Sequence, residues 1–91
     1  MGIRVNIFYP SIQQYIRNQD LVEVNGSTVG ECLDDLIRQF PGVEKWIFDE
    51  HRQLLRHVFV YVNAESARKV DLAKPVKDKD TLIIAVLITG G

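Results

Sequence analysis

The C-terminal pair Gly90-Gly91 is the feature of this 91-residue chain whose chemistry is easiest to specify. Neither residue carries a Cβ, so the pair forms a narrow peptide that reaches backbone conformations closed to other residues. A carboxylate at Gly91 would be ionised at neutral pH, because the reference pKa of an α-carboxyl group is roughly 3.3–3.7. The pair therefore predicts a tail that enters a slot in another protein and presents a carboxylate there. The alternative is two terminal glycines without a function, and the pair alone does not decide between them.

Other residues with reactive side chains offer weaker sites. Cys32 lies within an apolar repeat at helical spacing, so we expect a buried, unreactive thiol rather than a nucleophile or persulfide carrier. His51 and His57 match no structural-zinc spacing, and we expect both in a solvated loop. The pair Asp34-Asp35 is expected on the solvated face of the helix. The sequence thus predicts no catalytic acid–base pair and no metal site in this chain.

Composition indicates a single small domain over residues 1–91. Charged residues make up 25% of the chain and the formal net charge is −1, without a Lys/Arg cluster, which disfavours nucleic-acid binding. A lone cysteine excludes an internal disulfide. No leading apolar segment resembles a signal peptide, and no apolar run approaches the length of a membrane span. We therefore expect a cytoplasmic protein with neither a nucleic-acid nor a membrane partner.

The elements that would position the tail follow from hydrophobic spacing. Strand patterns occur in four segments, residues 3–8, 21–24, 58–62 and 82–88. The polar stretch 11–20 is expected to be the long loop of a hairpin between the first two strands. Thr28 and Glu31 form a capping-box signature, and the apolar repeat behind it predicts an amphipathic helix that Pro41-Gly42 stops.

Two connections lack a clear period. Residues 43–57 predict a short helical turn that covers one end of the core. Residues 71–80 predict a polar connection with a short helical turn near Leu72-Ala73. Within it, turn chemistry explains Asp78 and Asp80 more simply than cation binding.

The element order strand–strand–helix–strand–strand predicts an α+β domain. A helix that follows a hairpin must lie across one face of the sheet to bury its apolar stripe. If the first and last strands lie side by side and parallel, the crossover between them is right-handed. This arrangement is the β-grasp (ubiquitin-like) roll, a mixed sheet of about four to five strands with one main helix across one face. Residues 88–91 are expected to form an extended, flexible C-terminal tail.

On these residues the chain resembles the small ubiquitin-like sulfur-carrier proteins. That family includes the molybdopterin synthase small subunit, the thiamine sulfur carrier and the cysteine-synthesis sulfur carrier. The matching segments are Ile3–Phe8, residues 28–31 with Leu33 and Leu36, residues 60–63, residues 77–82 and Gly90-Gly91. The chain departs from the family at Lys79, where glycine is common, and at Thr89, where alanine or serine is commoner. The first departure requires a different turn or a strained backbone.

The resemblance implies a chemistry at the tail. An E1-like adenylyltransferase would activate Gly91 with ATP and Mg, and a sulfur donor would convert the acyl-adenylate into a thiocarboxylate. That group would pass its sulfur to an acceptor enzyme, whose active site Ile88, Thr89 and Gly90 would enter. The chain would be a carrier and substrate rather than an enzyme, with no bound cofactor. Its length and the segment before the third strand resemble the cysteine-type carrier, with the molybdopterin synthase small subunit as runner-up.

Aromatic residues on the third predicted strand indicate where a partner would dock. Phe59 and Tyr61 alternate with valines, so both faces of that strand are apolar although one helix covers only one face. We predict that Phe59, Tyr61 and Leu87 form the docking surface for the E1-like enzyme and the acceptor. The alternative is that residues 46–48 fold back over these rings.

Two further functions stay open at this point. One is a ubiquitin-like protein modifier that is conjugated through Gly91, because the same activated intermediate serves both chemistries. The other is a non-catalytic β-grasp interaction module, because a fold alone does not establish a function.

Overall fold

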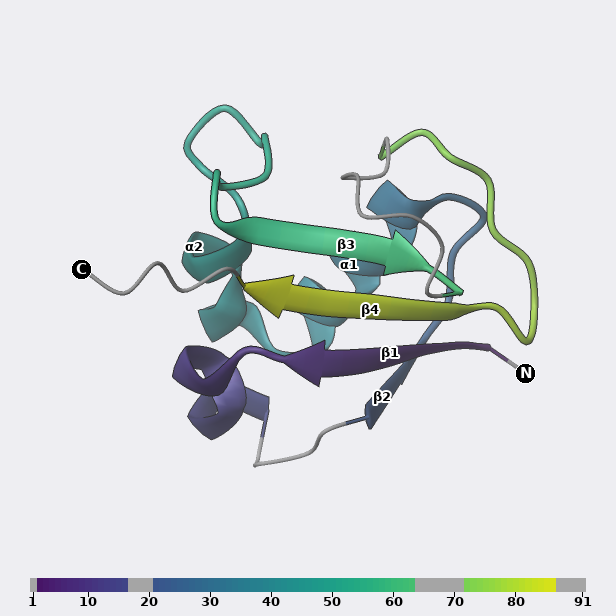
Figure 1. Cartoon of the computed structure of the whole chain (residues 1–91), viewed down its shortest axis with the longest axis horizontal. Helices are drawn as coiled ribbons and strands as arrows, with labels where there is room; N and C mark the ends of the chain where they lie inside the picture. Colours follow the sequence, from purple (N-terminus) through teal and green to yellow (C-terminus); the bar gives the residue numbers. More distant parts are fainter. Residues whose placement is uncertain (1, 17–20, 64–71, 87–91) are drawn as a thin grey trace.

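The computed structural model describes residues 2–16, 21–63 and 72–86. One four-stranded sheet has the order β2-β1-β4-β3 (Figure 1). Its strands are β1 (Ile3–Phe8), β2 (Leu21–Val24), β3 (Val58–Val62) and β4 (Thr81–Val86). Strands β1 and β4 run parallel, and the two outer pairings are antiparallel. The predicted α+β β-grasp fold is confirmed, and β4, an almost unbroken apolar run, lies inside the sheet.

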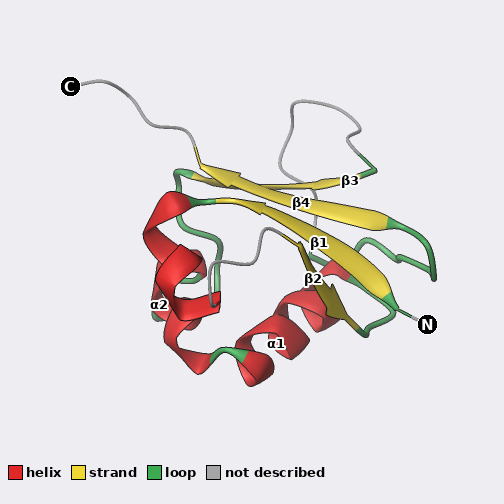
Figure 2. Cartoon of the chain, turned by 90° about the horizontal axis from the view of Figure 1, so that it is seen from below, coloured by secondary structure: helices red, strands yellow, loops and turns green. Residues whose placement is uncertain are grey.

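The helices lie on one side of this sheet (Figure 2). The helical elements are η1 (Pro10–Ile16), α1 (Val29–Gln39), η2 (Pro41–Val43) and α2 (Glu44–Ile47). Alternate strand residues such as Val5, Val60 and Ile84 are fully buried between the sheet and α1. Figure 2 shows that no helix of the described part of the chain covers the opposite face of the sheet.

The start of α1 is fixed by side chains, as the capping-box signature predicts. Thr28 is the N-cap, and its Oγ1 accepts a hydrogen bond from the Glu31 amide at 3.1 Å. The Glu31 carboxylate reaches one residue further back than in the standard motif and accepts the Ser27 amide at 2.8 Å. These bonds satisfy amide groups that a helix start otherwise leaves without partners.

The segment that leads into β4 pairs with the same helix end. The Val29 and Gly30 amides donate to the carbonyls of Lys74 and Leu72, at 3.0 and 2.8 Å. The predicted helical turn near Leu72-Ala73 is wrong, because these residues form a simple turn. In a helix the carbonyls of residues 72 and 74 would accept hydrogen bonds from amides of the same helix. In the structure they accept hydrogen bonds from α1 instead.

The predicted loop between β1 and β2 is also wrong in part. Residues 10–16 form the 3-10 helix η1, and its Ile12 and Ile16 are completely buried. Both side chains reach the core, although with three residues per turn a 3-10 helix does not bring residues four apart onto the same face. Polar residues separate the two isoleucines, and no helical period in the sequence marks them as buried.

Asp35 corrects the expectation that both adjacent carboxylates of α1 are solvated. Asp34 is exposed, but Asp35 is only 8% exposed. Its carboxylate accepts hydrogen bonds from the Asn25 amide at 3.0 Å, from the Arg38 guanidinium, and from the Gln39 amide at 3.2 Å. The buried carboxylate thus ties the β2–α1 connection to the helix.

Replacement of Asp35 by alanine tests that role. Burial raises the pKa of Asp35, but the hydrogen bonds from Asn25, Arg38 and Gln39 outweigh burial and hold the pKa below its usual value. We expect Asp35→Ala to lower the free energy of unfolding by about 1.5–3 kcal/mol at pH 7, the range for hydrogen bonds to a charged group. The carboxylate stabilises the fold above its unfolded-state pKa of about 3.9. That contribution is lost as the pH falls through the lower folded-state pKa.

Urea unfolding at pH 7 and in acid measures both effects. The difference in the free energy of unfolding between the wild-type protein and Asp35→Ala should become smaller in acid. Asp34→Ala is the matched control, because its exposed ion pair with Arg52 contributes little to stability. An equal loss in both variants would contradict the role of Asp35.

The turn into β4 has a strained backbone at Lys79, which is one of the two alternatives that the sequence departure left open. The Asp80 amide donates to the Lys77 carbonyl at 3.0 Å, and Lys79 has φ of 77°. A type II turn places glycine at this third position, because a Cβ there crowds the backbone. The Asp80 carboxylate accepts the Lys77 amide at 3.0 Å and the Asn63 side-chain amide at 3.1 Å. These hydrogen bonds show that Asp80 stabilises the turn, as the turn chemistry of the sequence predicts.

Lys79→Gly is expected to stabilise the protein. The substitution removes a left-handed conformation that costs a residue with a Cβ about 1–2 kcal/mol. It also gives the unfolded chain more freedom, worth roughly 0.5–1 kcal/mol. The net gain in urea unfolding should be about 0.5–1 kcal/mol from these two terms. Lys77→Gly, in the same turn without a positive φ, should lower the stability. A loss in both variants would show that the turn carries no strain.

Candidate functional site

Strand β4 ends between its two neighbours, and this end is the base from which the tail departs. In the sheet register Ala85 pairs with Phe8 of β1, and Val86 pairs with Val58 of β3. The predicted docking residue Leu87 and the predicted tail residues Ile88, Thr89, Gly90 and Gly91 lie outside the described residues. The predicted strand 82–88 matches β4 as far as Val86, and β4 starts one residue earlier, at Thr81.

An aromatic cluster packs beside this base. The buried Tyr9 directly follows β1, and its ring meets those of Trp46 and His57 edge to face, with centroids 6.4 and 6.2 Å apart. The Tyr9 hydroxyl donates to the Trp46 carbonyl at 2.9 Å. It also lies 3.1 Å from His57 Nε2, which must be the donor because the phenol has one proton. The cluster links the end of β1 to the segment before β3.

Sequence reasoning missed Tyr9. Burial raises the pKa of Tyr9, so the hydroxyl stays protonated and keeps its hydrogen bond to Trp46. The available signal was an amphipathic aromatic residue at the end of a strand, immediately before Pro10. His57, predicted in a solvated loop, is exposed but hydrogen-bonded to this cluster.

Phe59 and Tyr61 point away from α1. They are half-buried, whereas the valines that alternate with them are buried. The two rings stack with centroids 6.5 Å apart and an interplanar angle of 11°. The predicted docking surface requires both rings to face away from α1, and the structure has them in this orientation.

Neighbouring strands extend these two rings into a patch. Phe59 and Phe8 both pair with Ala85, and Tyr61 pairs with Ile83. Phe8 is 60% exposed, which is unusual for a phenylalanine. We call these five residues (Phe8, Phe59, Tyr61, Ile83 and Ala85) the outer patch. A groove of about 400 Å³ adjoins it at Phe8 and continues along Ile7, Tyr9, Pro10 and Gln13.

The segment 46–48 does not fold back over these rings. Trp46 packs against Tyr9 and Tyr15, and Phe48 lies under the Arg52 guanidinium, 4.9 Å from the ring centroid. Ile47 is completely buried in the core. This segment thus covers one end of the core, as predicted, on the helical side of the sheet.

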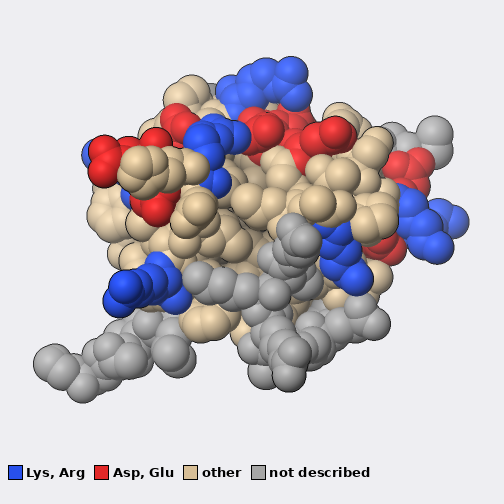
Figure 3. All heavy atoms as spheres, turned by 90° about the horizontal axis from the view of Figure 1, so that it is seen from above, with Lys and Arg blue, Asp and Glu red and all other residues tan. Residues whose placement is uncertain are grey.

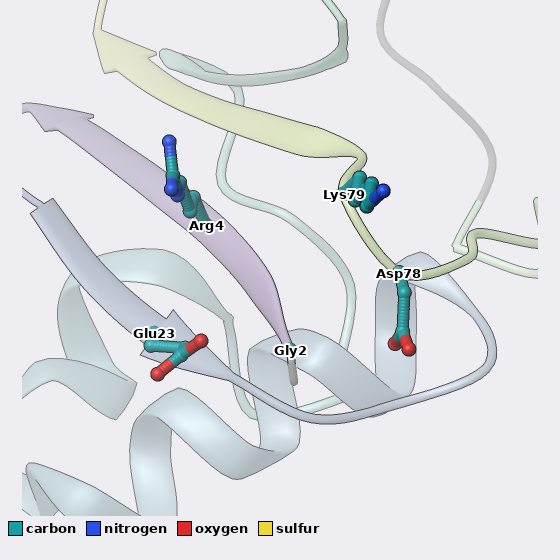
Figure 4. A pocket seen from close by; sticks show the side chains of 5 residues that line it. All are labelled: Gly2, Arg4, Glu23, Asp78 and Lys79. Carbon is teal, nitrogen blue, oxygen red and sulfur yellow. The ribbon is translucent and has the colours of Figure 1, made fainter.

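A second hollow lies at the opposite end of the sheet, where β1 and β4 begin. Figure 4 shows its lining of four charged side chains and one glycine, and its volume is about 450 Å³. The lining residues are Gly2, Arg4, Glu23, Asp78 and Lys79. We call it the charged cleft. Sequence reasoning did not find it, because three separate segments form it.

Cys32 is completely buried on α1, as the helical repeat predicts. Burial, with smaller contributions from Glu31 and Asp35, raises the pKa of the Cys32 thiol to about 11. The thiolate, which is the nucleophile, is therefore scarce at neutral pH.

We expect a thiol reagent to leave Cys32 unmodified in the folded protein. In urea or guanidinium chloride above the unfolding transition, Cys32 should react at the rate of a free thiol. Absorbance or intact mass measures the reaction. Fast modification of the folded protein would restore Cys32 as a candidate sulfur-handling residue.

No other reactive centre emerges from the described residues. No group of three or more His, Cys, Asp or Glu side chains there is arranged to hold a metal ion. On the face in Figure 3, Lys and Arg side chains alternate with Asp and Glu rather than forming a basic stripe. In the described ranges, no helix has the length and apolar character that a membrane span needs.

Comparison with known proteins assigns the family. The ThiS family model matches residues 5–91. The sulfur carrier protein CysO of Mycobacterium tuberculosis is 29% identical over 93 residues, which cover 98% of this chain and 100% of that protein. A chain in the Amycolatopsis orientalis BexX/CysO complex is similar with a TM-score of 0.85 and 32% identity, covering 99% of this chain and 100% of that one. SAMP1 of Haloferax volcanii is similar with a TM-score of 0.80 and 25% identity over 100% of both chains. This chain therefore belongs to the ThiS family of ubiquitin-like sulfur carriers.

Proposed function

We propose that this chain carries sulfur as a thiocarboxylate on Gly91, for a biosynthetic acceptor enzyme. The observation that carries the proposal is the family match over residues 5–91, which includes the terminal Gly90-Gly91. The five residues after Val86 would span up to about 17 Å if extended, because an extended residue adds roughly 3.3–3.6 Å. Such a tail is long and slim enough to reach a buried active site.

Activation is needed because a carboxylate is a poor acylating agent. In the proposed first step a Gly91 carboxylate oxygen attacks the α-phosphorus of ATP, and pyrophosphate leaves. In the second step the sulfur of a sulfide or a donor persulfide attacks the acyl carbon, and AMP leaves with the C–O bond electrons. Sulfide gives the thiocarboxylate directly, whereas a persulfide gives an acyl disulfide whose S–S bond a second thiol must reduce to release the thiocarboxylate. An E1-like partner would hold ATP and Mg, and the Mg would neutralise the charge that develops on the phosphates. The carrier itself would bind no cofactor.

We propose that the E1-like enzyme and the acceptor dock on the outer patch. A patch of exposed aromatic and aliphatic side chains marks a partner surface in a soluble protein. The outer patch and its adjoining groove border the end of β4, so a partner seated there would lie at the base of the tail. The A. orientalis relative occurs in a complex with BexX, and this supports a protein partner for this chain.

The pathway we favour is cysteine synthesis. The relatives named CysO are 29% and 32% identical to this chain, whereas the similar chain in the Helicobacter pylori molybdopterin-converting factor complex is 19% identical with a TM-score of 0.60, and this supports the cysteine-type carrier over the molybdopterin synthase small subunit. A thiocarboxylate form of this chain should therefore transfer sulfur to a cysteine-synthase-like enzyme from the same genome. Transfer only to a molybdopterin-synthase-like large subunit would assign the other pathway.

Intact mass of the protein from cells that contain its native partners tests the carrier function. A species heavier by one oxygen-to-sulfur exchange, and absent when Gly91 is deleted, is the expected result. Incubation with ATP and the cognate E1-like enzyme should also produce a C-terminal adenylate. If neither species forms, the carrier function is wrong.

The protein-modifier function is the second candidate. It is supported by the similarity to SAMP1, which is named a small archaeal modifier protein. Conjugates joined by an isopeptide bond from Gly91 to lysines of other proteins would favour it. These conjugates should survive reducing agents and denaturation as species of higher mass, whereas a thiocarboxylate changes the mass of the free carrier only by one oxygen-to-sulfur exchange.

A further inference from the structure

The charged cleft contains side chains of both signs at separate positions. Arg4 comes from β1 and Glu23 from β2, and Asp78 and Lys79 come from the turn before β4. In Figure 4 the two cations occupy the upper part of the view and the two carboxylates the lower part. The cleft therefore presents a positive side and a negative side rather than a uniform charge.

These four charges do not neutralise one another. Arg4 and Glu23 face each other directly in the β1–β2 register, a position where opposite charges normally interact. No ion pair within 4.0 Å in the described part of the chain includes either of them, or Asp78 or Lys79. Glu23 instead leans along the strand over Gly2, where an added Cβ would lie 2.9 Å from its Cγ. The absence of a Cβ at Gly2 leaves this position open to Glu23.

Lys79 holds its place at a cost to the backbone. Its φ of 77° is the conformation that glycine adopts freely, and the closed turn from Lys77 to Asp80 fixes it there. Strained backbone in a stable turn is an observation from which a function of the residue can be inferred. Glycine at this position would avoid the cost to the backbone, so the function is assigned to the Lys79 side chain, which glycine lacks.

The charged cleft and the outer patch lie at two ends of one surface. Residues Arg4, Asn6 and Phe8 alternate with buried residues along β1, so all three face away from α1. Phe8 belongs to the outer patch at the tail end, and Arg4 lines the charged cleft at the other end. A partner that covers the length of β1 would contact both.

We propose that the charged cleft is the orienting half of the surface on which the E1-like enzyme docks, an inference that rests on the proposed function. The partner presents an acidic group to Arg4 and Lys79 and a basic group to Glu23 and Asp78, while its apolar surface covers the outer patch. Complementary charges at the border of an interface raise the association rate and reject misaligned encounters. This arrangement directs the tail toward the nucleotide, because the outer patch and the end of β4 lie at the far end of the same surface.

Adenylation kinetics with the E1-like enzyme of the same genome test this inference. Lys79→Glu should raise KM about tenfold with kcat unchanged, because border charges act on association. Lys79→Gln should raise KM about threefold, and Lys79→Arg should leave it near the wild-type value by the same reasoning. The KM difference between wild type and Lys79→Glu should shrink as salt is added.

Lys77→Glu is the matched control, because it makes the same charge change two residues away, outside the cleft. It should change KM less than about twofold if the cleft rather than net charge matters. Lys79→Gly should be more stable than the wild-type protein and yet have a raised KM, which separates the effect from misfolding.

Three outcomes would overturn the inference. Equal KM values for wild type, Lys79→Glu and Lys77→Glu, with normal adenylation, would reject the role of the cleft and leave the carrier function intact. A concentration-dependent dimer that Lys79→Glu disrupts would show instead that the cleft binds a second copy of this chain. If the wild-type protein is not adenylated at all, the proposed function fails, and this inference fails with it.

Discussion

Deletion of Gly90 and Gly91 is expected to abolish adenylation and thiocarboxylate formation completely. In the proposed function the reacting group is the carboxylate of Gly91, and truncation would move the carboxylate to Thr89, a bulkier residue two positions earlier in the chain. The free energy of unfolding should change by less than about 0.5 kcal/mol, as for surface changes in general. In the described part of the chain, the buried core residues lie between Ile3 and Ile84. Pyrophosphate release and intact mass measure the reaction, and urea unfolding measures the stability.

Gly90→Val is the companion variant, since it keeps the Gly91 carboxylate and adds a branched side chain beside it. A displacement of about 1 Å at a reacting group can cost about 100-fold in rate. We therefore expect kcat/KM for adenylation to fall at least about 100-fold, with normal stability. Efficient adenylation of Gly90→Val would show that the partner has no narrow slot. Retention of the biological function by the truncated chain would favour the interaction module instead.

Replacement of Tyr61 by aspartate is expected to raise KM for adenylation about 30-fold or more. Aromatic residues at the centre of an interface commonly contribute 2 kcal/mol or more, roughly 30-fold in affinity. Tyr61 is half-buried, stacks on Phe59 and lies beside Ile83 on the outer patch. A carboxylate there would have to be desolvated against an apolar partner surface. kcat at saturating carrier should change little, because the reacting carboxylate stays unchanged.

Ser27→Asp is the matched control for Tyr61→Asp. It adds the same charge at an exposed position beside the start of α1, away from the outer patch. Its KM should stay within about twofold of the wild-type value, as expected for a change outside the interface. Circular dichroism and urea unfolding establish that both variants are folded. Equal KM values for both variants would mean that the partner does not use the outer patch.

The strands and the main helix were predictable because their signals are local. Alternation along residues 3–8 gives one buried and one outer side, and β1 has these bounds. The pair Thr28 and Glu31 marks the start of α1, since a capping box needs only residues three apart. Cys32 was correctly placed in the core for the same reason, its position in a helical repeat. The departure from glycine at Lys79 indicated either a different turn or a strained backbone, and the positive φ of Lys79 is the second of these.

The sequence signals failed where a contact joins distant segments. Asp35 is charged and follows the exposed Asp34, so its burial was not visible before α1 was placed against the β2–α1 connection and Asn25. Ile12 and Ile16 lie in a polar stretch, and their burial follows from the packing of η1 into the core cluster rather than from a local pattern. Tyr9 and His57 meet across 48 residues, and no local pattern encodes that bond.

The sequence by itself determined the chemistry available to this protein: a slim glycine tail, an unreactive cysteine and a β-grasp order of elements. These depend on residue types and on spacing within one element, which a linear pattern contains. Only the tertiary structure decided which apolar residues remain outside. The register that pairs Phe8 and Phe59 with Ala85 creates the outer patch. The same packing brings Arg4, Glu23 and Lys79 into one cleft. Both surfaces arise from pairing between strands, whose partners are far apart in the chain and close only after folding.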